Sequence, residues 1–293
     1  MLKSPAGELR GPVKEQTMNA IRRQPPKHTV LSTRQLRMRI TCDDPIHRGK
    51  KRIKLSGKEL SNLPPNLFNL TELEVLDLSP EREACLFYHL ERIPVEISKL
   101  TNLTVLALDT NRLESLPDEL CQLYSLERLA LSNNQLTDLP ASLPQMSSLR
   151  SLYCSNNKFQ HLPGSVCQLK QLVFLDFSDN FLTSIPHEIG SMDSLESLVL
   201  SYNKIESLPD SICNLKTLQM LWLCGNCLSS LPKGLGKLIN LDWSHMMLTS
   251  ALDGNPLEYP PISVAKQGPE AIDKFLSLHQ SNAVKPKPKN LRA

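Results

Sequence analysis

Residues 103–125 read LTVLALDTNRLESLPDELCQLYS, and six such 23-residue units follow one another without a gap from Leu103 to Asn240. Each unit fits the pattern L-x-x-L-x-L-x-x-N-x-L-x-x-L-P-x-x-L-x-x-L-x-x, with other apolar residues replacing Leu at some positions. The units start at Leu103, Leu126, Leu149, Leu172, Leu195 and Leu218. A fixed period of this length indicates a stack of supersecondary units, each of which buries its faces against its neighbours.

The spacing within a unit predicts its local structure. L-x-x-L-x-L predicts a short strand, because its last two apolar residues alternate with residues that face solvent. The Asn that follows takes the bend, where its side-chain amide can hydrogen-bond backbone groups of adjacent coils. The L-P dipeptide sets the return path, since Pro fixes φ and lacks an N–H donor. The bend residues are expected to stack as a ladder: Asn134, Asn157, Asn180, Asn203 and Asn226.

The array extends past the regular units at both ends. A first coil begins near Lys50, and a second coil starts at Leu73 but carries a long insertion at residues 79–89. The Leu86-Phe87-Tyr88 run in this insertion is either tucked under the loop or presented to a partner. A ninth coil is expected to be irregular, with an insertion or distorted turn at residues 242–246, before the pattern resumes at Leu252.

Composition divides the chain into four segments. Residues 1–49 form a basic, Pro-containing extension, expected to be largely disordered with a short capping segment near residues 37–40. Residues 50–264 are the repeat array, and residues 265–280 are expected to form a helix that closes the last coil. Residues 281–293 form a basic, disordered tail. The apolar face of the closing helix consists of Ile272, Phe275 and Leu276.

Charge is distributed unevenly along the chain. Residues 1–54 hold fourteen Lys and Arg against four Asp and Glu, a net charge of +10, and residues 285–293 add four basic side chains. Since the whole chain carries +3, residues 55–284 carry 3 − 10 − 4, which is −11. The basic ends suggest contact with nucleic acid or an anionic membrane surface, whereas solvated extensions are the alternative interpretation.

Motifs that would carry catalysis are weak. Cys224-Gly225-Asn226-Cys227 is a CxxC that suggests a redox or zinc-binding protein, but its Asn is the repeat's bend residue and no second cysteine pair lies nearby. The sequence lacks a glycine-rich phosphate loop and the serine-hydrolase and zinc-protease motifs. We therefore expect no enzyme activity, no catalytic residue, no metal and no cofactor.

Cysteine usage bears on the compartment. The eight cysteines are scattered through the coils instead of being paired in caps, which is typical of reduced thiols. The sequence also lacks an early apolar run resembling a signal peptide and a run long enough for a membrane span. These features predict a cytoplasmic protein.

The unit with its L-P dipeptide and the sequences of residues 254–261, GNPLEYPP, and 268–276, GPEAIDKFL, resemble intracellular leucine-rich repeat proteins. The similarity is to the group that includes the arrays of Scribble, Erbin and Ras-pathway scaffold proteins, and it covers about residues 50 to 278. The resemblance implies an α/β solenoid of about nine coils. Such a solenoid is curved, with a parallel sheet on its concave face and irregular or short helical segments on its convex side.

The same resemblance implies a role in protein–protein binding, and a component of a small-GTPase pathway is the partner it suggests. The concave face is the expected binding surface, because its outward side chains have no packing role. Neighbouring aromatic residues and Met on such a face are typical of interface hot spots. The sequence thus predicts a non-enzymatic interaction module or scaffold in intracellular signalling, without a small-molecule substrate. The predicted partner-binding residues are Tyr153, Phe174, Val199, Tyr202, Met220 and Trp222.

Overall fold

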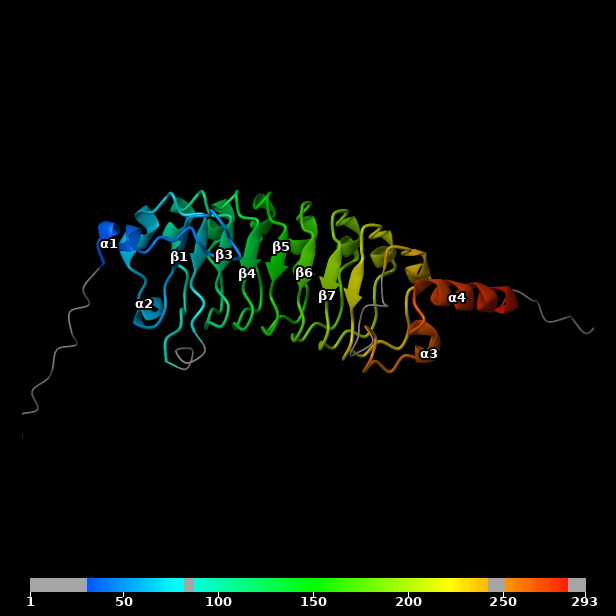
Figure 1. Ribbon diagram of the computed structural model, residues 1–293. Coiled ribbons are helices and arrows are strands. Elements are labelled where there is room, and N and C mark those ends of the chain that lie inside the picture. The colour runs from blue at the N-terminus through cyan, green and yellow to red at the C-terminus, as the bar shows by residue number, and fades with distance from the viewer. Residues whose placement is uncertain (1–30, 82–86, 242–250, 284–293) are drawn as a thin grey trace, which may run out of the picture. The chain divides into compact units, whose positions relative to one another are not determined.

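The computed structural model describes residues 31–81, 87–241 and 251–283 of the 293-residue chain (Figure 1). An eight-stranded parallel sheet runs through these residues, and its strands lie in chain order. Each strand pairs with the next at the same repeat position, so that Leu129 lies beside Leu152 and Leu152 beside Leu175. The strands are β1 (Arg52–Lys54), β2 (Val75–Asp77), β3 (Val105–Ala107), β4 (Arg128–Ala130), β5 (Ser151–Tyr153), β6 (Phe174–Asp176), β7 (Ser197–Val199) and β8 (Met220–Trp222).

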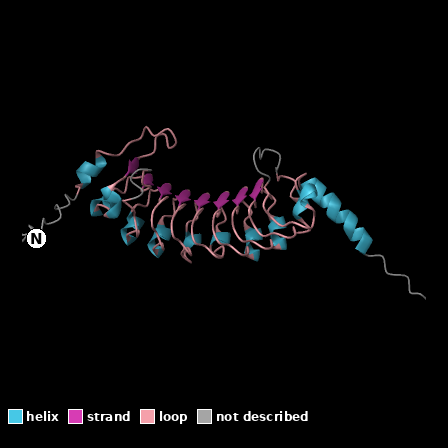
Figure 2. Cartoon of the chain, turned by 90° about the horizontal axis from the view of Figure 1, so that it is seen from below, coloured by secondary structure: helices cyan, strands magenta, loops and turns pink. Residues whose placement is uncertain are grey.

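Short 3-10 helices line the side of the array opposite the sheet (Figure 2). Each follows the proline of its coil, as η4 follows Pro117, which has a φ of −73°. This layering confirms the predicted α/β leucine-rich repeat solenoid with short helical segments away from the sheet. The 3-10 helices are η1 (Pro65–Asn69), η3 (Val95–Lys99), η4 (Asp118–Gln122), η5 (Leu143–Gln145), η6 (Val166–Gln168), η7 (His187–Ser191), η8 (Asp210–Asn214) and η9 (Leu235–Lys237).

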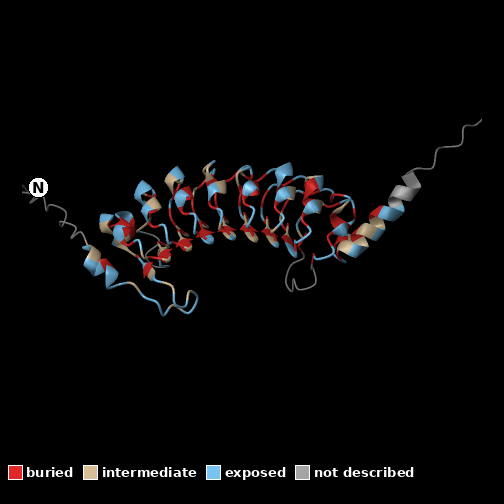
Figure 3. Ribbon diagram, turned by 90° about the horizontal axis from the view of Figure 1, so that it is seen from above, coloured by how far each residue is buried: buried red, intermediate tan, exposed pale blue. Residues whose placement is uncertain are grey.

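The core lies between these two layers (Figure 3). The leucines of the pattern are almost completely buried, as at Leu103, Leu106 and Leu108 of the third coil. Where phenylalanine replaces leucine in adjacent coils, Phe159 and Phe177 pack edge to face with ring centroids 4.9 Å apart. Each coil therefore buries its apolar side chains against both neighbours.

The predicted asparagine ladder is confirmed. Asn180 is buried, and its Nδ2 donates to the backbone oxygens of Cys154 in the coil before, at 2.9 Å, and of Phe177 in its own coil, at 3.2 Å. Its Oδ1 accepts the backbone N–H of Phe159 at 3.1 Å. The same bonds recur in coils 3 to 8, and Asn255 continues them in the ninth coil. The ladder satisfies backbone groups that the bend would otherwise leave buried and unpaired.

A polar side chain just before the first leucine of a coil bonds the preceding coil at four places. The side chains of Asn102, Ser194, Thr217 and Asn240 each donate to a backbone oxygen of that coil, over 2.8 to 2.9 Å. These bonds were not predicted from the sequence, because Asn, Ser and Thr all serve at this position and no single residue type marks it.

Residues 31–49 contain a cap that the sequence analysis placed in the largely disordered extension. Helix α1 (Thr33–Arg37) begins with a capping box between Ser32 and Gln35 and buries Leu36 completely in the core of the array. Farther on, Thr41 forms an antiparallel bridge with Arg52 of the first strand. Helix α2 (Lys58–Ser61) follows in the first coil.

Basic residues of this cap pair with acids of the array. Arg37 Nε lies 2.7 Å from Glu72, and an Arg39 guanidinium nitrogen lies 2.7 Å from Glu59. The Arg37 guanidinium holds the pKa of Glu72 below its ordinary value, chiefly through their hydrogen bond. Part of the basic charge of the amino-terminal segment is thus paired with carboxylates of the same chain.

The insertion in the second coil leaves the ladder intact. After it, the backbone N–H of Leu90 donates to Asn111 Oδ1 at 2.8 Å, as the equivalent residues do in regular coils. The Leu86-Phe87-Tyr88 run lies partly outside the described residues, since residues 82–86 are not described. Phe87 itself is 74% exposed, so its ring is presented to solvent.

The ninth coil resumes after residues 242–250, where the predicted insertion or distorted turn lies outside the described residues. The N–H of Leu223 donates to Ala251 at 2.8 Å, and that of Gly225 donates to Asp253 at 2.7 Å. In coils 3 to 7, equivalent bonds span 22 residues, whereas here they span 28. The six additional residues therefore precede Ala251, as the sequence pattern predicted.

Two helices follow the ninth coil, α3 (Ile262–Ala265) and α4 (Pro269–Ala283). The closing helix starts at Pro269, later than residue 265, and continues to Ala283. Helix α4 packs on η9 and buries Ile272 and Leu276, while Phe275 contacts Tyr259 with ring centroids 5.5 Å apart.

Helix α4 approaches the array closely at Gly236. A Cβ at this position would lie 2.6 Å from the backbone nitrogen of Asp273 and 2.7 Å from the oxygen of Pro269. We expect Gly236→Ala to push α4 away from η9 and to lower the free energy of unfolding by about 2 kcal/mol, as overpacking does elsewhere. Hydrogen exchange should show lost protection in residues 269–278.

The matched control is Gly164→Ala, because a Cβ there meets no atom within 4 Å. It should leave both stability and exchange in α4 unchanged. Equal effects of the two substitutions would contradict the close packing of α4 on the array.

Candidate functional site

The side chains at the first and third positions of every strand point away from the core, onto what we call the open face of the sheet. Residues at the middle position, such as Leu175 and Leu198, are fully buried. On β5 to β8 the open face therefore presents two side chains from each strand that are not part of the core, whereas Val75, Val105 and Ala130 on β2 to β4 are buried.

The structure brings five of the six predicted binding residues together on β5 to β8. The rings of Tyr153 and Phe174 lie 4.7 Å apart at a tilt of 31°. The register aligns Ser197 with Met220 and Val199 with Trp222. We call the set the aromatic patch: Tyr153, Phe174, Val199, Met220 and Trp222.

Members of the aromatic patch remain accessible to different degrees. Met220 is 38% exposed, whereas the other four residues are half-buried. The guanidinium carbon of Arg128, from β4, lies 4.4 Å from the ring centroid of Tyr153. The indole Nε1 of Trp222 is buried and has no hydrogen-bond partner among the residues that the structure describes.

Tyr202, the sixth predicted residue, lies at the edge of this patch in the turn after β7. It is 57% exposed and has a φ of 55°, an unusual conformation for a bulky residue. Its ring packs over Gly225, where a Cβ would lie only 2.6 Å from a ring carbon. Gly225 thus allows the tyrosine ring to lie against the turn of the next coil.

Acidic residues accompany the aromatic patch, and sequence reasoning missed them as site residues. Asp176 is in β6, Asp179 is in the turn that follows, and Glu196 immediately precedes β7. Asp176 Oδ1 accepts bonds from the backbone N–H and hydroxyl of Ser178, at 2.9 and 2.7 Å. Burial raises the pKa of Asp179, and the charge of Asp176 raises it further. The sequence held a signal for Asp176 and Asp179, because they lie two and five residues after Phe174, the first residue of β6.

The amino-terminal half of the open face is different, because its charges are paired internally. Arg52 binds Asp44 and also lies 2.7 Å from Asp77. Lys50 lies 3.5 Å from Glu127. Arg52 and Lys50 are therefore already engaged by carboxylates, whereas Arg128 of β4 lies on the ring of Tyr153.

Most of the described cysteines are buried or half-buried within the coils. Cys154 is completely buried, and burial raises the pKa of its thiol well above the ordinary value. Burial likewise raises the pKa of Cys167 to about 12. Cys224 and Cys227 are both free thiols, the first buried and the second exposed. Within residues 31–81, 87–241 and 251–283, no group of three or more His, Cys, Asp or Glu side chains could hold a metal ion.

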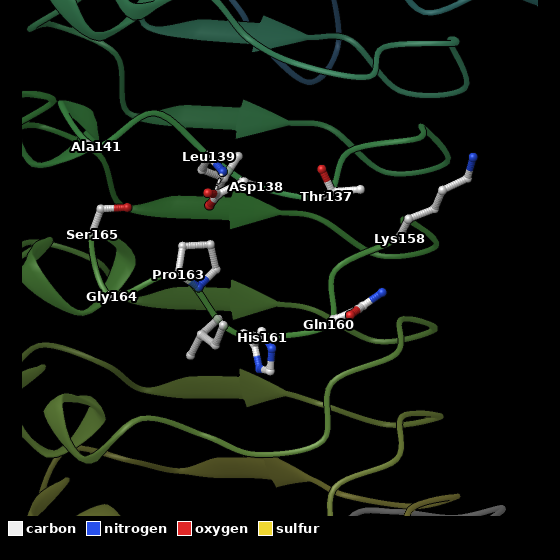
Figure 4. Close-up of a pocket in the computed structure, with 11 residues that line it drawn as sticks. Thr137, Asp138, Leu139, Ala141, Lys158, Gln160, His161, Pro163, Gly164 and Ser165 are labelled. Carbon is white, nitrogen blue, oxygen red and sulfur yellow. Dashed lines mark hydrogen bonds between the residues drawn. The ribbon is translucent and has the colours of Figure 1, made fainter.

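A shallow hollow lies away from the open face, between the L-P turns of coils 4 and 5. It has a volume of about 630 Å³ (Figure 4). Asp138 accepts the N–H of Leu139 there, and Lys158 extends away from the other lining side chains. A similar hollow of about 440 Å³ lies beside Phe87. Neither has the enclosed apolar lining typical of small-molecule sites.

Comparison with known proteins agrees with this architecture. A family model described as a leucine-rich repeat region matches residues 118–201 and 154–251. Residues 31–81, 87–241 and 251–283 contain no helix with the length and apolar character needed to cross a membrane. No curated protein matches the chain.

Several solved structures are similar. A leucine-rich repeat protein of Leptospira interrogans is 35% identical, with a TM-score of 0.65, over 73% of this chain and 52% of that one. The ectodomain of the Arabidopsis thaliana receptor kinase GASSHO1/SCHENGEN3, in complex with CASPARIAN STRIP INTEGRITY FACTOR 2, is 28% identical, with a TM-score of 0.56, over 72% and 30%. An internalin of Listeria monocytogenes is 25% identical, with a TM-score of 0.55, over 69% and 57%.

The chain forms a repeat solenoid, with stacked coils, a parallel sheet and strand side chains that lie outside the core. Solenoids of this kind use such surfaces for protein–protein interaction. With its asparagine ladder and the family match, the chain is a leucine-rich repeat protein. It spans roughly half or less of the Leptospira and Arabidopsis structures that it resembles, and 57% of the internalin.

Proposed function

We propose that this chain is a non-enzymatic binding module that holds a protein partner on the open face of coils 5 to 8. The observation that carries the proposal is the aromatic patch, in which large side chains are gathered at positions that the packing of the coils does not use. Aromatic residues and Met at such positions are typical of the centres of interfaces. The Arabidopsis ectodomain, with the same fold, was solved in complex with another molecule, which supports a binding role.

We further propose that the module acts as a cytoplasmic scaffold in a signalling pathway. The free cysteines within the coils support a reducing compartment. The resemblance to Ras-pathway scaffold arrays supports a component of a small-GTPase pathway as the partner.

The alternative function is binding of nucleic acid or an anionic membrane through the basic ends of the chain. It is supported by the net charge of those ends, but the pairing of Arg37, Arg39 and Arg52 with acids of the array counts against it. Binding of this kind should weaken steeply as salt concentration rises.

A set of three open-face substitutions tests the main proposal. We expect the combined Phe174→Ala, Met220→Ala and Trp222→Ala variant to lose its specific partners, with binding weakened at least about a hundredfold, because truncating several hot-spot side chains removes most of the interface energy. The measurement compares partners captured from cell lysate by wild type and variant, followed by titration of each purified partner.

The matched control replaces exposed apolar residues on the side of the 3-10 helices, by Val95→Ala, Tyr124→Ala and Ile239→Ala. This variant should keep the partners of the wild type. Circular dichroism and thermal melting establish that both variants are folded. Retention of every partner by the folded open-face variant would refute the proposed site.

A further inference from the structure

In coils 6 to 8, the described charges beside the aromatic patch all have one sign. On the open face of coils 6 to 8, the described residues that carry charge are Asp176, Asp179 and Glu196, and no Lys or Arg stands among them. The raised pKa of Asp179 reflects in part the charge of Asp176. A cation brought to this surface would relieve that repulsion, whereas a phosphate would increase it.

The arrangement of side chains leaves room beside one of these acids. In the row formed by the first strand positions, Ser197 lies between Phe174 and Met220. Because serine is much shorter than its two neighbours, a partner's side chain can lie above Ser197 and contact both. Asp176, two residues beyond Phe174 on the same strand, then lies next to that side chain.

Asp176 has an oxygen available for such a contact. Its Oδ1 is engaged by Ser178, but Oδ2 makes no hydrogen bond or ion pair within the described part of the chain. A guanidinium suits this position, because it can donate to a carboxylate while its flat face lies on an aromatic ring.

The protein already uses this chemistry one coil away. Arg128 lies over the ring of Tyr153 at 4.4 Å, and the ring of Phe174 contacts Tyr153 at 4.7 Å. The order along the face is therefore guanidinium, tyrosine and phenylalanine. At the next place in the order, beside Phe174 and Asp176, no ion pair or cation–π contact is made by a Lys or Arg of the described residues.

Two buried polar groups of coils 7 and 8 also lack partners among the described residues. Trp222 Nε1 and Ser201 Oγ are buried without a hydrogen bond to any residue that the structure describes, and Ser201 is only 3% exposed. Such groups are costly to leave unpaired. A backbone oxygen of a bound peptide segment could accept from either of them if neighbouring side chains shift on binding.

From these observations we infer that the partner presents an arginine-bearing segment to the open face, with its guanidinium beside Asp176 and Phe174 above Ser197. The inference rests on the proposed function and adds the chemistry of the partner. It predicts a cationic protein segment with adjacent apolar side chains as the ligand of this face.

The test uses small probes on the full chain. Nα-acetyl-argininamide is titrated while the methyl resonance of Met220 is followed in protein labelled with ¹³C at the methionine methyl groups, and Met220→Leu assigns that resonance. We expect a saturable shift with argininamide. Its uncharged isostere, Nα-acetyl-citrullinamide, should bind roughly tenfold more weakly, since it loses both the ion pair and the cation–π contact.

Two variants localise the effect. Asp176→Asn should weaken argininamide binding by about fivefold, whereas Asp193→Asn, which changes an exposed acid outside the patch, should not. Equal shifts with the arginine and citrulline probes, or no saturable shift at Met220, would overturn the inference. A synthetic peptide of residues 284–293 that shifts Met220 at lower concentration than argininamide would also overturn it, by identifying the chain's own tail as occupant.

The two proposals fail separately. In one outcome, the Phe174, Met220 and Trp222 triple variant loses its partners, but argininamide does not bind preferentially and Asp176→Asn has no effect. This outcome would support the binding face and refute only its cationic ligand. Retention of partners by the triple variant would refute the face itself, whatever the probes show.

Discussion

Phe177→Ala is expected to lower the free energy of unfolding by about 3–5 kcal/mol, because it removes a completely buried ring and leaves a cavity that the stacked coils cannot close. Phe177 packs edge to face on Phe159 of the coil before, so the substitution also removes an aromatic contact between coils. Urea denaturation followed by circular dichroism measures the loss.

The position of the loss is also predictable. Since each coil contacts only its neighbours, hydrogen exchange should accelerate most in coils 5 to 7 and least near α1. Phe181→Ala is the matched control, because this ring is 46% exposed and faces Lys204 on the surface. The control should change stability by less than about 1 kcal/mol. A uniform effect along the array would contradict nearest-neighbour stacking.

Asn180→Ala is expected to cost about 3 kcal/mol. The change deletes an amide that donates to backbone oxygens of Cys154, Phe177 and Ser178 and accepts from the N–H of Phe159. The three oxygens keep one other hydrogen bond each, from Asn157, Asn203 and the backbone N–H of Asn156, whereas the buried N–H of Phe159 loses its one partner among the described residues. An unsatisfied buried group costs about 1–3 kcal/mol, so the total exceeds the worth of one ordinary hydrogen bond. Thermal and urea unfolding of the variant measure the difference.

Asn214→Ala provides the comparison for the same chemical change. Asn214 is exposed at the end of η8, and its side chain is outside the ladder. Its replacement should be within about 0.5 kcal/mol of wild type. If the two variants were equally stable, the ladder would not be a source of stability, and its role would be limited to shaping the bend.

Most of the fold was predictable from the sequence because each repeat unit packs against the units next to it in the chain. A strand in one coil pairs with the strand 23 residues later, as at Leu129 and Leu152, so the period itself specifies the sheet register. The bend residue was predictable for the same reason: Asn180 has an equivalent in each regular coil, and one side chain is needed there for every turn. The exposed strand positions that form the aromatic patch followed directly from the alternation within a strand.

Other features required the tertiary structure. Residues 31–49 carry no repeat, so only the structure shows that Leu36 closes the first coil and that Arg37 is paired with Glu72. These contacts depend on where a non-repeating segment folds back, which no periodicity encodes.

The chemistry of the binding face was likewise decided in three dimensions. The sequence by itself determined a leucine-rich repeat array and which side chains leave its core. Only the tertiary structure set Arg128 on the ring of Tyr153 and that ring against Phe174. The physical reason is that stacking brings side chains of different coils into one surface. A contact between a guanidinium of one coil and an aromatic ring of the next therefore depends on how both side chains lie, and the pattern of a single unit does not specify it.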